Sequence, residues 1–188
     1  MKNFVIIGAG GFGQEAGETA KRIDESDSDF RFIGYIDDNK ELHKTFLNEV
    51  PILGDLNWIN DSFNEEDLYF MCSIGDTIIK KEVGEKALDK GYTPFSIIHP
   101  SVIIRYGVKI GDGVTIGPGT VVAPNVHIKN NVIVNQVCSL GHNDVINDYC
   151  TISPLSAISG GVVLGEGVYF GTGASILQYI NIGEFPSS

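Results

Sequence analysis

Basic residues are scarce in this sequence. Against 24 Asp and Glu there are only 13 Lys and Arg, which gives a net charge of -11 over 188 residues. Nucleic acids and anionic membranes attract basic surfaces, so neither is expected as a partner. Cysteines are few as well: there are three, an odd number without CxxC spacing. This predicts neither a disulfide framework nor a zinc site, and we expect no bound metal.

Long apolar runs are also missing. No stretch of 18 apolar residues occurs, and the N-terminus becomes glycine-rich after a short apolar segment. These features are not those of a transmembrane helix or a signal peptide, and they predict a cytoplasmic location. The apolar fraction of 43% is nevertheless sufficient for a buried core.

The first half of the chain alternates strand-like and helix-like segments. We expect strands at 4–7, 31–37 and 67–73, with helices at 13–23 and 77–90. Strands separated by helices favour a parallel sheet covered on both faces. The prediction is an α/β, Rossmann-like domain over residues 1–97.

From residue 98 a six-residue period begins. Fifteen successive hexads place Ile, Leu, Val or Phe at the same position, from Ile98 through Ile116, Leu140 and Ile152 to Ile182. A short strand and a turn fill six residues, and three such units close a triangular coil of a parallel β-helix. Gly or Asn often follows the aliphatic residue, as at Gly117 and Gly141, and we expect positive φ there. This all-β domain is predicted over residues 98–188.

A glycine loop follows the first expected strand. Gly8, Gly10 and Gly13 form a G-x-G-x-x-G pattern that opens a helix, where main-chain amides favour phosphate. Asp37 and Asp38 end the second strand, where a ribose-binding acid lies in dinucleotide folds. Taken alone, the pattern suggests an NAD site. Against it, the second mononucleotide unit is lacking, and a β-helix offers no place for hydride chemistry.

Several short segments of the sequence, taken together, resemble a known family. "IIGAGGFGQE", "IDD", "PILGD" and "SIGD", followed by hexads with Asn135 seven residues before His142, are similar to PglD/NeuD-like sugar acetyltransferases. This resemblance implies a left-handed β-helix, acetyl-CoA as co-substrate, and a homotrimer with CoA in the groove between neighbouring prisms. It also implies that His142 is the general base, a task that suits a group with a pKa near neutrality. Without the resemblance, a histidine in such a repeat is more often a polar turn residue, as we expect of His127.

The chain departs from the family pattern beside this histidine. Asn143 stands where the family usually has an acid, and it carries no charge with which to raise the basicity of His142. Asp144, next in the chain, either replaces the missing carboxylate or stabilises the turn. We include both residues with His142 in the expected catalytic set.

The resemblance also implies two sets of binding residues. The substrate set is Gly8, Gly10, Gly11, Phe12, Gly13, Asp37, Asp38, Gly75, Asp76, Lys80 and Asn135. The acetyl-CoA set is Thr151, Ser159, Gly160, Gly161, Gly171 and Gly173. Lys80 and its neighbour Lys81 are assigned on the expectation that they face a diphosphate, although such lysines are more often simply solvated.

We therefore predict an acetyl-CoA-dependent N-acetyltransferase that acts on a UDP-linked amino sugar. Two alternatives stay open, namely an O-acetyltransferase of sialic acid or a related sugar and a nucleotide-sugar-binding scaffold without turnover. The ending "IGEFPSS" does not continue the repeat, which predicts a C-terminally truncated β-helix domain.

Overall fold

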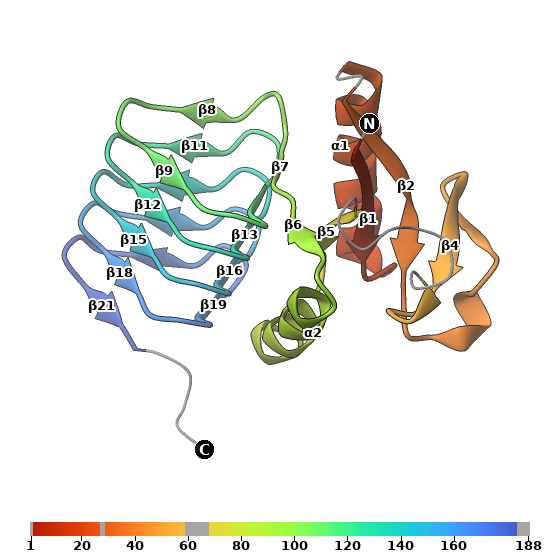
Figure 1. Ribbon diagram of the computed structural model, residues 1–188. Coiled ribbons are helices and arrows are strands. Elements are labelled where there is room, and N and C mark those ends of the chain that lie inside the picture. Colours follow the sequence, from red (N-terminus) through yellow and green to blue (C-terminus); the bar gives the residue numbers. More distant parts are fainter. Residues whose placement is uncertain (1, 27–28, 59–67, 184–188) are drawn as a thin grey trace.

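The computed structural model describes residues 2–26, 29–58 and 68–183. Asp67, the first residue of one expected strand, and residues 184–188, the end of the expected β-helix domain, lie outside this range. Within it, no helix is long and apolar enough to cross a lipid bilayer. The chain forms an α/β domain followed by a three-sided prism of short strands (Figure 1).

The α/β domain is built on a six-stranded sheet with the order β3-β4-β2-β1-β5-β6. Its pairs are parallel except for β3 with β4. In chain order the elements are β1 (Lys2–Ile7), α1 (Gly11–Ser26), β2 (Phe30–Ile36), a 3-10 turn (Lys40–Leu42), β3 (Phe46–Leu47), β4 (Val50–Gly54), β5 (Leu68–Cys72), α2 (Thr77–Asp89) and β6 (Thr93–Pro94). The expected strands and helices are present within a few residues, whereas β3, β4 and β6 were not predicted.

Both faces of this sheet are covered, as the alternation of strands and helices predicted. Phe4 and Ile6 of β1 pack with Ala16 of α1 on one face. Val5 of β1 packs with Ala87 of α2 on the other. Successive side chains of a strand point to opposite faces, so the apolar residues 4–7 of β1 serve both clusters.

The prism consists of three parallel five-stranded sheets. The first contains β7 (Ile97–Ile98), β10 (Thr115–Ile116), β13 (Ile133–Val134), β16 (Thr151–Ile152) and β19 (Tyr169–Phe170). The second contains β8 (Ile103–Ile104), β11 (Val121–Val122), β14 (Ser139–Leu140), β17 (Ala157–Ile158) and β20 (Ser175–Ile176). The third contains β9 (Lys109–Ile110), β12 (His127–Ile128), β15 (Val145–Ile146), β18 (Val163–Leu164) and β21 (Asn181–Ile182).

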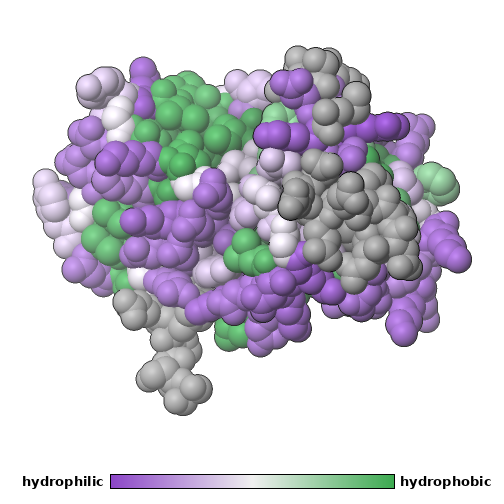
Figure 2. Space-filling view, in the orientation of Figure 1, coloured by the Kyte–Doolittle hydropathy of each residue, from purple (hydrophilic) through white to green (hydrophobic). Residues whose placement is uncertain are grey.

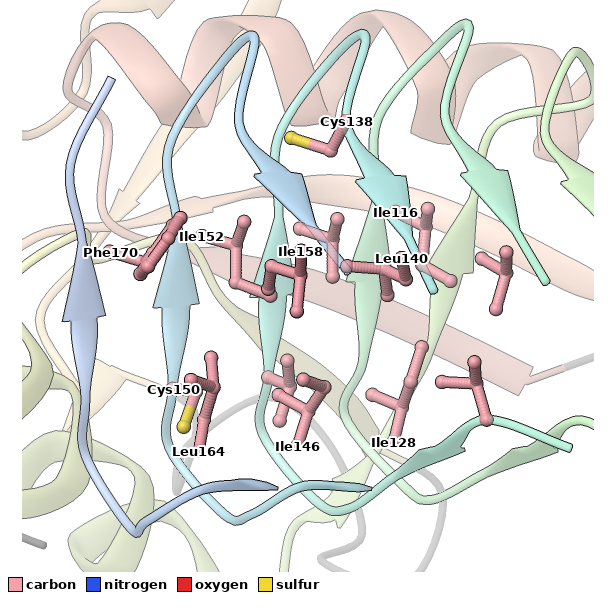
Figure 3. Close-up of a cluster of buried hydrophobic side chains, with 14 of the residues drawn as sticks. Ile116, Ile128, Cys138, Leu140, Ile146, Cys150, Ile152, Ile158, Leu164 and Phe170 are labelled. Atoms are coloured by element: carbon pink, nitrogen blue, oxygen red, sulfur yellow. The ribbon is translucent and has the colours of Figure 1, made fainter. Parts of the chain in front are cut away.

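The predicted coil of three hexads is confirmed by the pairing. Ile116 pairs with Val134, and Val134 pairs with Ile152, so each coil advances by 18 residues. The hexad side chains point inward and stack from coil to coil (Figure 3). Burying each aliphatic side chain contributes about 1.5–3 kcal/mol, so the prism has a core of its own.

The hexad residue is less covered in the first coil. Ile104 of β8 is 44% exposed, because its second-sheet column begins there and no earlier strand covers it. Figure 2 shows a hydrophobic patch at the end of the prism where β8 lies.

The expected positive-φ position was wrong. Left-handed residues lie three positions after the hexad residue, as at Asn125, Asn143 and Gly161. Gly117 and Gly141, which directly follow it, have no positive φ. A Cβ on Gly117 would lie 2.7 Å from the Gln136 amide nitrogen, and one on Gly141 would overlap the Gly160 amide. Glycine is needed there because adjacent coils approach closely.

Candidate active site

The glycine loop connects β1 to α1 and is held by backbone geometry. Gly8 has φ +102°, and a Cβ on Gly13 would overlap the Gly8 carbonyl oxygen. The Ala9 amide donates to Asp37 Oδ2 (2.8 Å), and the Asn39 amide donates to Asp37 Oδ1 (2.9 Å). Asp37 therefore fixes the loop, and Gly13 permits the helix to pack on it.

A pocket of about 450 Å³ opens at the carboxyl ends of β1, β2 and β5. Most of the expected substrate residues line it: Gly8, Gly10, Gly11, Phe12, Asp37, Asp38 and Gly75. Ser73, Ile79 and Val83 line it too and were not predicted, because single Ser, Ile or Val residues form no motif. Asp76 instead caps α2, where its Oδ1 accepts from the Ile78 and Ile79 amides at 3.0 and 2.9 Å.

Lys80 does not face this pocket, which corrects its expected role. It is fully buried, and its Nζ donates to the Cys150 carbonyl (2.8 Å) and to Thr151 Oγ1 (2.7 Å) in the prism. Burial lowers the pKa of the Lys80 ammonium to about 7. Thr151 is itself buried, so it joins the domains and is not open to acetyl-CoA. Lys81 forms an ion pair with Glu166 across the same junction.

Asn135 is likewise used within the prism. Its Nδ2 donates to the Ile152 carbonyl (3.0 Å) and so ties one coil to the next. Asn135 lies at the turn from the first sheet to the second, whereas His142 lies at the turn from the second to the third. The structure therefore does not bring these two residues to one corner.

His142 is exposed at the turn that follows β14. Its ring lies over Gly160 of the next coil, where a Cβ would be 2.5 Å from Nε2. The His142 carbonyl accepts from the Gly161 amide (2.8 Å), which fixes the backbone beneath the ring. The ring is thus on the surface of the prism, and a side chain at Gly160 would displace it.

Asn143 lies beside the His142 ring. Its Nδ2 is 3.3 Å from Nδ1, and donation there leaves the ring proton on Nε2. A half-turn of the amide places Oδ1 at Nδ1 instead, so that Nδ1 donates and Nε2 is free to accept a proton. The orientation of the Asn143 amide therefore selects the tautomer of the expected base.

Asp144 points into the prism and not to the surface. It is fully buried in the row of Val126 and Val162, and its Oδ1 accepts from the Val162 amide (2.9 Å). Its Oδ2 is buried without a hydrogen-bond partner. Burial raises the pKa of the Asp144 carboxyl to about 6, although the nearby His142 acts in the opposite direction. Its bond to the next coil favours the structural alternative over direct support of the histidine.

We expect Asp144→Asn to stabilise the protein above pH 6. The folded pKa lies above the ordinary value of 3.8, so stability is lost as the pH rises between these values. Asparagine cannot ionise, and removing the buried charge should raise the free energy of unfolding at pH 8 by about 1–3 kcal/mol, with little gain at pH 4. Thermal unfolding followed by circular dichroism at both pH values measures this. The exposed Asp112→Asn is the control, and an equal effect at both pH values would contradict the prediction.

The expected acetyl-CoA residues fall on two corners of the prism. Ser159, Gly160 and Gly161 lie beside His142, at the turn from the second to the third sheet. Gly171 and Gly173 follow β19 and lie at the turn from the first to the second.

The pocket and the histidine lie on opposite sides of the chain. Turns from the second to the third sheet, such as those after β8 and β11, lie at the left edge of Figure 1. β14 pairs with β11, which places the turn of His142 in the same row. The α/β domain lies at the right edge.

Comparison with known proteins gives matches to two family models and relatives that align with most of the chain. Residues 3–87 match the PglD N-terminal domain, and residues 94–124 match the bacterial transferase hexapeptide repeats. GDP-perosamine N-acetyltransferase of Escherichia coli O157:H7 is 29% identical over 182 residues, covering 95% of this chain and 79% of the relative.

Two solved structures are similar over nearly the whole chain. The acetyltransferase domain of PglB from Neisseria gonorrhoeae FA1090, in complex with acetyl coenzyme A, has a TM-score of 0.85 and 25% identity, covering 97% of this chain and 85% of that one. PerB from Caulobacter crescentus, in complex with CoA and GDP-perosamine, has a TM-score of 0.84 and 26% identity, covering 98% and 84%. The two matched domains and these relatives show that the chain is an acetyltransferase with a PglD N-terminal domain and a left-handed β-helix of hexapeptide repeats.

Proposed function

We propose that this protein transfers the acetyl group of acetyl-CoA to the amine of a nucleotide-linked amino sugar, with His142 as general base. The observation that carries the proposal is the exposed His142 imidazole seated on Gly160, in a chain whose other domain has a glycine-loop pocket. The similarity to GDP-perosamine N-acetyltransferase supports the N-acetyl assignment.

The chemistry is a direct transfer. The sugar amine attacks the thioester carbonyl, and the new C–N bond replaces the C–S bond. The amine proton moves to Nε2 of His142, which is free to accept it when Asn143 Oδ1 accepts from Nδ1. The proton on the imidazole then neutralises the departing thiolate. Main-chain amides of the neighbouring turn are the expected donors to the oxyanion.

The carboxylates at the pocket favour one nucleotide over another. Asp37 already accepts from two loop amides, whereas Asp38 is exposed and lines the pocket. Guanine presents two adjacent N–H donors to a carboxylate, and uracil presents one. This chemistry and the GDP-perosamine bound by PerB favour GDP over the UDP expected from the sequence.

A homotrimer accounts for the separation of the pocket and the histidine. In one chain the row of turns that includes the turn after β14 and the α/β domain that carries the pocket lie on opposite sides of the prism (Figure 1). Prisms packed side by side bring the pocket of one copy toward His142 of the next, with CoA in the groove between them. The cytoplasmic location predicted from the sequence stays a prediction. Both substrates are expected to be present there.

A thiol-release assay tests the function. Acetyl-CoA is offered with GDP-perosamine, with UDP-linked 4-amino sugars and with sialic acid, and free CoA is measured. We expect release with GDP-perosamine and an N-acetylated product by mass spectrometry. Release with sialic acid alone would favour the O-acetyltransferase, and folded protein that releases no thiol with any acceptor would favour the scaffold.

A further inference from the structure

Tyr179 lies in the last coil that the structure describes, two coils after His142 and in the same row of turns. The turns of His142, Gly160–Gly161 and Tyr179 are stacked at one corner of the prism. The Gly161 amide donates to the His142 carbonyl (2.8 Å), and the Tyr179 amide donates to the Gly160 carbonyl (3.1 Å). The three turns therefore form one continuous surface.

Two rings cover the two glycines in between. A Cβ on Gly160 would lie 2.5 Å from His142 Nε2, and one on Gly161 would lie 2.5 Å from Tyr179 Cδ1. Consecutive Cα atoms are about 3.8 Å apart, so the imidazole and the phenol lie over neighbouring residues. A group that reacts at Nε2 must approach close to the Tyr179 ring.

The backbone at Tyr179 is costly for a bulky residue. Its φ is +60°, a region that favours Gly and Asn, and its side chain is 76% exposed. Tyr149 has the same φ, but it is buried and its ring contacts α2 near Gly84. Tyr179 gains no such burial, so most of its ring is available to contact a molecule bound at this corner.

We propose that Tyr179 limits the length of the acyl group that the enzyme transfers. The inference rests on the proposed function, because the thioester carbon must lie near Nε2 for transfer to occur. An acetyl group ends in a single methyl, whereas a butyryl chain extends further and meets the phenol ring. Leu177, which is also exposed, lies in the same turn as Tyr179.

The test compares acyl donors of different length. kcat/KM is measured for acetyl-CoA and butyryl-CoA with GDP-perosamine, in wild type, Tyr179→Gly and Tyr179→Phe. We expect wild type to prefer acetyl-CoA and Tyr179→Gly to reduce this preference tenfold or more. Tyr179→Phe, which keeps the ring, should retain it. Glycine suits the positive φ, so the variant should fold.

Leu155→Gly is the matched control. Leu155 also has a left-handed φ of +62° and is 62% exposed, but it lies at the turn from the first to the second sheet. It should keep the wild-type preference. An unchanged preference in an active Tyr179→Gly variant, or a wild type that uses both donors equally, would overturn the role of Tyr179 alone. A wild type without acetyl transfer to any acceptor would overturn the proposed function and, with it, this inference.

Discussion

Replacing His142 with alanine should lower kcat for acetyl transfer by about 10²–10⁴-fold. The imidazole presents a basic nitrogen at the surface of this corner, and Asn143 beside it has none. Because the side chain is exposed and its carbonyl, not its ring, bonds to the next coil, the fold should tolerate the change. Steady-state thiol release at saturating acetyl-CoA measures kcat, and thermal unfolding confirms that the variant is folded.

His127→Ala is the control for this variant. His127 lies in β12 on the third sheet, half-buried, and does not belong to the turn that His142 occupies. It should keep kcat within about twofold of wild type. Wild-type-like kcat in His142→Ala would show that another group takes the proton, and the mechanism proposed here would then be incorrect.

Most of the prism follows from its sequence because one period governs it. An aliphatic residue every six positions predicts the coil length, the inward side chains and the parallel pairing, all of which the structure confirms. The turn residue was assigned to the wrong position because glycine serves two needs in each hexad. Gly161 has a left-handed φ, whereas Gly141 makes room for the next coil, and one-letter patterns do not separate the two.

The lining of the glycine-loop pocket was predictable where its residues are contiguous in the sequence. The loop from Gly8 to Gly13 is one motif, and Asp38 closely follows the adjacent strand β2. Residues on α2 were not, because their role depends on which face of the helix they occupy. Ile79 and Val83, one turn apart, face the pocket, whereas Lys80 faces the prism. The apolar residues of 77–90 do not recur with a clear helical period, so the sequence did not show which face of the helix is turned toward the pocket.

Lys80→Met should lower the free energy of unfolding relative to wild type, by an amount that grows as the pH rises. In the folded protein the pKa of Lys80 is about 7, below its ordinary value of 10.5. Between these values the unfolded chain binds more protons, so wild-type stability rises with pH by up to about 1.4 kcal/mol per unit. Methionine keeps the stem but leaves Cys150 and Thr151 without their donor, and it removes this pH dependence. Near pH 6.5 two effects of the substitution on the free energy of unfolding cancel. The lost hydrogen bonds lower it, and the absence of a buried charge raises it. At pH 9 wild type should be more stable by about 2–3 kcal/mol, as measured by urea unfolding.

Lys81→Met separates this effect from a general loss of positive charge at the junction. Lys81 forms its ion pair with Glu166 at 2.7 Å, with both side chains more than a third exposed, and exposed pairs contribute about 0–1 kcal/mol. The free energy of unfolding of Lys81→Met should therefore differ little from that of wild type, and the difference should stay nearly constant from pH 6.5 to 9. Parallel stability curves for Lys80→Met and wild type would mean that Lys80 does not change its charge within this range. If only the Lys80→Met curve diverges from wild type, then α2, which lines the glycine-loop pocket, is held to the prism by an amine that is mostly neutral at pH 9.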